Sequence, residues 1–136
     1  MKLVLVSGLS GSGKSTALRT LEDLGYYCID NLPVPLLHEF AQQMQRRPID
    51  SIRNSAVGID ARNLEEDLRQ VPEILDRLKE DGIDCEVVFL TADDDALFKR
   101  FSETRRKHPL SGNRHSLADA IESERVRLEP IAARAN

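Results

Sequence analysis

The sequence predicts an α/β domain in which helices cover both faces of a parallel sheet. Short runs rich in Val and Ile alternate with longer segments whose apolar residues recur every three or four positions. Such alternation is typical of β-α-β units, which place parallel strands side by side beneath helices. A chain of 136 residues suits one domain with one core, so we expect residues 1–136 to form a single unit.

Four short apolar runs are expected to form the strands of this sheet. They cover residues 2–7, 26–30, 55–60 and 85–91. Each has the length of a strand and is followed by polar or turn-forming residues. The chain ends in a helical pattern with no further apolar run, so we expect the sheet to lack its last strand and the native protein to continue.

Helical periodicity is expected between and after the strands, in residues 14–24, 34–45, 64–80 and 93–105 and from residue 117 onward. Pro72 should kink or divide the third of these helices, because proline lacks the N–H that a helix interior needs. Asn63 stands where a side-chain oxygen would cap the start of the same helix. These helices would complete the two outer layers of the domain.

The charge balance argues against a nucleic-acid-binding surface in this chain. Lys and Arg total 19 and Asp and Glu total 23, which gives a formal net charge of -4. A domain that neutralises nucleic-acid phosphates is usually basic. No segment approaches the roughly 18 uninterrupted apolar residues of a membrane span, and the apolar start is too short for a signal peptide. We therefore expect a cytoplasmic protein with no membrane contact.

A glycine-rich phosphate loop follows the first predicted strand. It matches G-x-x-x-x-G-K-[ST] at every required position with Gly8, Leu9, Ser10, Gly11, Ser12, Gly13, Lys14 and Ser15. A strand before the loop and a helix after it would direct backbone N–H groups and the positive helix end at an anion. A flexible turn with a chance lysine is the alternative, but strand, motif and helix agree. We therefore predict a P-loop NTPase fold of the kinase-like kind.

The chemistry of such a loop assigns roles to its last two residues. Lys14 would neutralise the β- and γ-phosphates of ATP or GTP, which makes it a candidate catalytic residue. The hydroxyl of Ser15 would be a ligand of Mg²⁺.

Two aspartates are candidates for a second contribution to the Mg²⁺ site. Asp30 and Asp60 each stand at the end of an apolar run, where the crevice of an open α/β sheet forms. Either could instead cap a helix or close a turn. The sequence leaves both candidates open.

Arg105 and Arg106 are candidates for a lid over the phosphates. They stand where a predicted helix gives way to a connection rich in turn formers. From such a position guanidinium groups could close over the nucleotide and stabilise charge that develops during hydrolysis. The alternative is a solvated helix end whose cations complement the helix dipole.

Four segments together resemble a known protein family over essentially the whole chain. They are SGLSGSGKS at 7–15, LEDLGYYCIDNLP at 21–33, DARN at 60–63 and TRRKHPL at 104–110. These segments resemble the N-terminal half of the RapZ/YvcJ family of bacterial nucleotide-binding proteins. The resemblance implies ATP and GTP binding, with residues 8–15 as the phosphate site. It also implies that guanine nucleotides are bound by Asp60, Ala61, Arg62 and Asn63.

The same resemblance implies a regulatory rather than a metabolic role. In one branch of the family the whole protein is an RNase adapter that binds small regulatory RNAs, presents them to RNase E and controls amino-sugar synthesis. The resemblance implies that the RNA contacts belong to a C-terminal domain, which we expect to lie outside residues 1–136. We expect at most a slow ATPase or GTPase, and a homo-oligomer when the protein is full-length. The alternative is a sugar or nucleoside kinase, although no cluster of substrate-binding groups is evident after Asp30.

Overall fold

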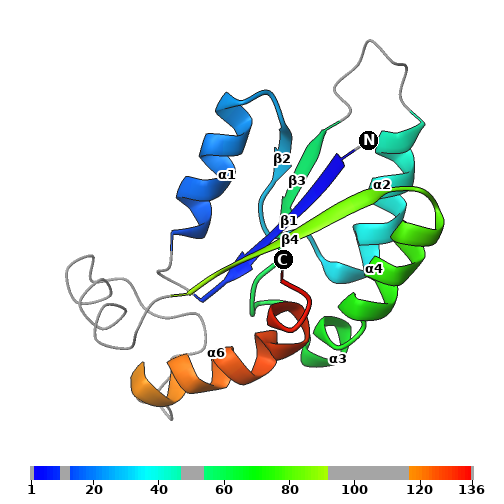
Figure 1. Cartoon of the computed structure of the whole chain (residues 1–136). Coiled ribbons are helices and arrows are strands. Elements are labelled where there is room, and N and C mark those ends of the chain that lie inside the picture. Colours follow the sequence, from blue (N-terminus) through cyan, green and yellow to red (C-terminus); the bar gives the residue numbers. More distant parts are fainter. Residues whose placement is uncertain (1, 10–12, 47–53, 92–116, 136) are drawn as a thin grey trace.

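The computed structural model describes residues 2–9, 13–46, 54–91 and 117–135. Four parallel strands form one sheet: β1 (Lys2–Gly8), β2 (Tyr27–Ile29), β3 (Ser55–Gly58) and β4 (Asp84–Leu90). Their order across the sheet is β2-β3-β1-β4, with Val6 beside Gly58 and Gly8 beside Leu90 (Figure 1). All four predicted strands are confirmed to within two residues at each end.

Helices cover the two faces of the sheet because successive strand residues point to opposite sides. The helices are α1 (Lys14–Asp23), α2 (Leu37–Gln45), α3 (Glu65–Leu68), α4 (Val71–Glu80) and α6 (Leu117–Ala132). Leu3 and Leu5 of β1 belong to a large core that faces α2, α4 and α6, whereas Val4 and Val6 pack with Leu18 of α1 on the other side (Figure 1). The predicted layers are therefore present in the structure.

One predicted helix differs at its start from what the sequence indicated, and a second divides as predicted. The segment 34–45 opens with a 3₁₀ turn, η1 (Val34–Leu36), before α2 begins. The segment 64–80 divides into α3 and α4, and Pro72 lies in the first turn of α4, where its missing N–H costs no helical hydrogen bond. Asn63 caps neither helix, because its side chain is bonded to the backbone of η1. The predicted helix 93–105 lies outside the described residues.

The order of the strands predicts a crevice between the carboxyl ends of β1 and β3. The chain leaves β1 through α1 towards β2, and it leaves β3 through α3 and α4 towards β4, on the opposite face. Right-handed crossovers in opposite directions require this change of face. In open α/β sheets, ligands bind where two neighbouring strands send their connections to opposite faces. The binding crevice expected for this topology therefore lies beside the glycine loop.

Candidate phosphate site

The end of β1 and the start of α1 form the described part of the phosphate loop, whereas Ser10, Gly11 and Ser12 lie outside it. A Cβ atom at Gly8 would stand 2.4 Å from the carbonyl oxygen of Leu90, so a side chain has no room there. The N–H of Leu9 donates to that same oxygen (3.1 Å). Gly13 has a φ of 99°, a left-handed conformation that favours glycine. Both glycines are thus required by the backbone.

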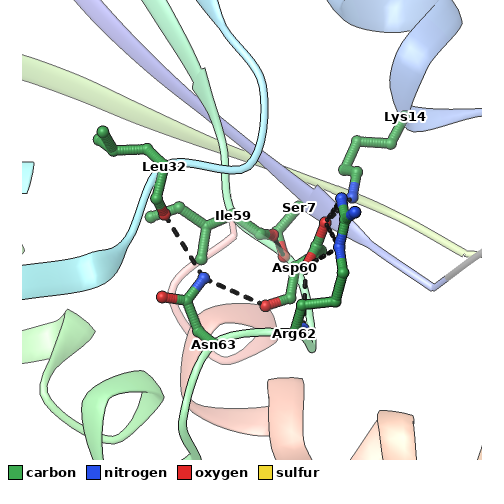
Figure 2. A network of polar contacts seen from close by, with 7 residues as sticks. All are labelled: Ser7, Lys14, Leu32, Ile59, Asp60, Arg62 and Asn63. Carbon is green, nitrogen blue, oxygen red and sulfur yellow. Dashed lines mark hydrogen bonds and ion pairs between the residues drawn. The ribbon is translucent and has the colours of Figure 1, made fainter. Parts of the chain in front are cut away.

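Lys14 extends from the first turn of α1 to the carboxylate that follows β3. Its Nζ lies 3.0 Å from Oδ2 of Asp60, and the two side chains are 13% and 5% exposed (Figure 2). An ion pair this far from water interacts more strongly than one on an open surface. Residues 46 positions apart therefore meet at the crevice between β1 and β3.

Arg62 binds the same carboxylate from the other side. Its Nη2 lies 2.6 Å from Oδ2 of Asp60, and its backbone N–H donates to Oδ1 at 2.9 Å. Burial by itself raises the pKa of Asp60, but the hydrogen bonds from Arg62 and the charge of Lys14 outweigh it and lower the pKa to about 2. Asp60 is therefore ionised at neutral pH. Arg62 itself is 54% exposed, so its side chain reaches the rim of the crevice.

The backbone before Asp60 is fixed to β1. The N–H of Ile59 donates to the carbonyl oxygen of Val6 (3.0 Å), and Oγ of the buried Ser7 donates to the carbonyl oxygen of Ile59 (2.6 Å). These bonds continue the alignment of β3 with β1 by one residue beyond the strand. They determine where Asp60 leaves the sheet.

Asn63 closes the loop that begins at Asp60, as Figure 2 shows. Its Oδ1 accepts from the N–H of Val34 (2.8 Å), and its Nδ2 donates to the carbonyl oxygens of Leu32 and Asp60 (both 3.4 Å). The residue is 9% exposed. The amide of Asn63 therefore connects loop 60–63 to the segment that follows β2.

Asp30 occupies a different position from Asp60. It follows β2, which is separated from β1 by β3, and its Oδ1 would lie 2.8 Å from a Cβ atom at Gly58. Its charge contributes to the raised pKa of Arg62, after the larger effect of the hydrogen bond from Arg62 to Asp60. The structure therefore places Asp60 beside Lys14 and Asp30 one strand further out.

The sequence motifs include most of the residues that meet here. They do not include Ser7 and Arg127, which hold the backbone on either side of Asp60. Ser7 could have been noticed as the polar residue that follows the apolar run 3–6 in β1. Arg127 of α6 donates to the backbone of loop 60–63 from more than 60 positions away, and no local pattern marks it. Arg105 and Arg106, predicted as a lid, lie outside the described residues.

The phosphate-loop motif implies Mg²⁺, and the oxygen groups here suit that ion. Ser15 is exposed in the first turn of α1, and Asp60 supplies an ionised carboxylate. Mg²⁺ is usually held by one or two protein oxygens together with phosphates and water. These donors fit Mg²⁺ bound together with a nucleotide.

Comparison with known families gives a match over the full chain. The model of the RapZ-like N-terminal domain matches residues 1–136. The chain is 54% identical over 136 residues to a nucleotide-binding protein of Methylococcus capsulatus, covering 100% of this chain and 46% of that protein. It is 56% identical over 136 residues to a nucleotide-binding protein of Nitrosococcus oceani, covering 100% and 47%. The chain spans about half the length of these curated relatives.

Among solved structures, YorR of Bacillus subtilis, in complex with phosphorylated GDP, has a similar fold. The TM-score is 0.58 with 18% sequence identity, covering 98% of this chain and 81% of that chain. At this identity the likeness concerns the fold alone. None of the helices among the described residues is long and apolar enough to span a membrane.

Proposed function

This chain belongs to the RapZ-like N-terminal domain family, and we propose that it binds the phosphates of ATP and GTP at the carboxyl edge of its sheet. One observation carries the proposal. Lys14 pairs with the ionised Asp60 between β1 and β3, directly beside the glycine loop. A lysine and a helix N-terminus supply positive charge for phosphates, and the carboxylate supplies the oxygen that a phosphate-bound cation needs.

Each part of the proposed site has a role in binding. The loop from Gly8 to Ser15 surrounds the phosphates with backbone N–H groups, and Lys14 neutralises the terminal phosphates. Ser15 and Asp60 would hold Mg²⁺, which would offset phosphate charge. Asp60 is favoured over Asp30 because it lies beside Lys14.

The segment of Asp60, Ala61, Arg62 and Asn63 contributes to the same site. Asp60 and Arg62 face the phosphate side of the crevice, where the half-exposed guanidinium of Arg62 can reach an anion. The family resemblance implies that this segment binds guanine nucleotides, and we propose that role for the four residues together. The amide of Asn63 is engaged with backbone groups, so we assign that side chain the role of holding the loop rather than of contacting the base.

We further propose that hydrolysis, where it occurs, is slow and regulatory. Lys14 would act on the terminal phosphate, and Arg105 and Arg106 would close over it. The domain would control a longer cytoplasmic RNase adapter that binds small regulatory RNAs and RNase E, forms a homo-oligomer and regulates amino-sugar synthesis. The formal net charge of -4 supports an RNA surface outside this domain.

Titration calorimetry with Mg-ATP and Mg-GTP tests the proposal, followed by hydrolysis assays with and without sugar and nucleoside acceptors. Binding with slow turnover that no acceptor changes would support a regulatory nucleotide-binding domain. Stoichiometric transfer of phosphate to an acceptor would identify a kinase instead. Absence of binding to either nucleotide would refute the proposed function.

A further inference from the structure

The guanidinium group of Arg127, far from Asp60 in the sequence, is hydrogen-bonded to the loop that carries Asp60. Nη2 of Arg127, on α6, donates to the carbonyl oxygens of Ala61 (3.0 Å) and Asn63 (2.5 Å). These two carbonyls stand on either side of Arg62 in the chain. Arg127 therefore joins both ends of the turn from which Arg62 reaches the Asp60 carboxylate.

The remaining contacts of loop 60–63 leave this turn dependent on outside support. Within the loop, the N–H of Asn63 donates to the carbonyl oxygen of Asp60 (3.2 Å), and the N–H of Arg62 donates to the Asp60 carboxylate (2.9 Å). Outside the loop, the Asn63 side chain connects only its last residue to the chain after β2. Ala61 is buried in the core, and among the hydrogen bonds above those of Arg127 hold the backbone on both sides of Arg62.

Docking of α6 does not by itself explain an arginine at this position. The helix is already held by buried apolar side chains, namely Ala120, Ile121, Leu128 and Ile131. Next to its end, Arg134 makes two hydrogen bonds with Asp76 (2.9 and 3.1 Å). Arg127 is partly buried, and its buried Nε finds no acceptor among the described residues. Burying part of a guanidinium group costs free energy, which its hydrogen bonds must offset. For Arg127 the hydrogen bonds that do so are the two to loop 60–63.

We propose that Arg127 is a positioning residue of the phosphate site, which fixes loop 60–63 so that the Asp60 carboxylate meets Lys14. The inference rests on the proposed nucleotide binding. Arg127 does not touch the nucleotide in this account and acts through the loop backbone. A shift of α6 would consequently move the Asp60 carboxylate, so this helix links the phosphate site to the last part of the chain.

The test compares three variants of the intact protein. Arg127→Met removes the two donated hydrogen bonds and keeps an apolar stem of similar reach, while Arg127→Lys keeps the charge and single-point donation. Arg134→Met is the matched control, because it removes a two-bond arginine contact from the same end of the chain but does not touch loop 60–63. The Lys variant provides the measurement if Arg127→Met fails to fold.

The first measurement is hydrogen exchange at the backbone amides of Arg62 and Asn63, which needs no nucleotide. We expect exchange to be faster by about tenfold in Arg127→Met, less so in Arg127→Lys, and unchanged in Arg134→Met. Unchanged exchange in both Arg127 variants, or equal acceleration in Arg134→Met, would overturn the inference. This result is independent of the proposed function.

The second measurement is ATP and GTP affinity with Mg²⁺ and with the ion chelated. Because Asp60 serves the Mg²⁺ side of the site, Arg127→Met should reduce the gain in affinity that Mg²⁺ provides by about tenfold. A loosened fold would instead weaken binding equally in both conditions, and that outcome would overturn the positioning role. If the unaltered protein binds no nucleotide, the proposed function fails, and the exchange result alone decides whether Arg127 positions the loop.

Discussion

Asp60 is the residue on which the contacts of the phosphate site converge. Lys14 and Arg62 both donate to its carboxylate, and the side chain is only 5% exposed. A carboxylate removed from water is stable in its charged form only when cations or N–H groups replace the lost hydration. Here two cations and one backbone N–H do so, which explains why the pKa of Asp60 falls despite burial.

Replacing Asp60 with alanine should therefore destabilise the fold. The change leaves the largely buried Lys14 without its carboxylate, and we expect the free energy of unfolding to fall by about 2 kcal/mol. Urea denaturation measures this loss, with Asp76→Ala as the control, since Asp76 forms an exposed pair with Arg134. A loss for Asp60→Ala no greater than that of the control would show that the pair adds little to stability.

The polar residues near this site also show how far sequence reasoning reaches. Lys14 and Ser15 follow from a local motif, because the glycine spacing and the helix start are adjacent in the chain. Asp60 and Asp30 were indistinguishable by that means, since each follows an apolar run. The distinction depends on β3 lying next to β1, with β2 beyond it, and strand order is not written in local spacing.

Periodicity was sufficient to locate the four strands and those predicted helices that lie within the described residues, whereas the ends of these elements depend on tertiary contacts. The segment 64–80 divides before Val71, as Pro72 led us to expect, but the exact ends of the two helices were not predicted. Asparagine is a common helix-capping residue, but the side chain of Asn63 instead accepts a hydrogen bond from the N–H of Val34. Such competition between local and distant partners is invisible until the chain is folded.

The close approach of β1 and β4 gives a prediction for Gly8. In Gly8→Ala the new Cβ would stand 2.4 Å from the Leu90 carbonyl oxygen, so the strands must separate. We expect a loss of more than about 2 kcal/mol in the free energy of unfolding. Gly82→Ala is the control: φ is also positive there but no atom lies within 4 Å, so only backbone strain of about 1 kcal/mol is expected.

Thermal or urea unfolding of both alanine variants decides between these expectations. Equal losses at Gly8 and Gly82 would mean that the β1–β4 approach relaxes freely.

The bond between loop 60–63 and η1 gives a further prediction. Asn63→Ala removes the acceptor of the buried Val34 N–H, and an unpaired buried donor costs about 1 to 3 kcal/mol. Asn54→Ala is a suitable control, because Asn54 is exposed and accepts from the Lys2 backbone at 3.4 Å. Urea denaturation should show a clear loss for the first variant and little for the second. Similar values for both would indicate that water replaces the lost acceptor.

In the whole molecule, the proposed phosphate site is a consequence of topology. Because β1 and β3 are neighbours that send their connections to opposite faces, the glycine loop after β1 and loop 60–63 after β3 meet through the contact of Lys14 with Asp60. The fold class and the location of the phosphate loop could be predicted from alternation and motif. The contribution of α6 could not, because it depends on how residues near the end of the chain pack against those in the middle.

Nucleotide titration of Lys14→Ala tests directly whether this lysine binds the phosphates of ATP and GTP. Lys79→Ala is the control, since Lys79 is an exposed lysine near the end of α4. With both variants folded, we predict that Lys14→Ala binds Mg-ATP and Mg-GTP at least about tenfold more weakly than the unaltered chain, because a charge-assisted contact to phosphate is lost. Lys79→Ala should bind as the unaltered chain does. Undiminished affinity in a folded Lys14→Ala variant would show that the glycine loop and its lysine do not form the phosphate site.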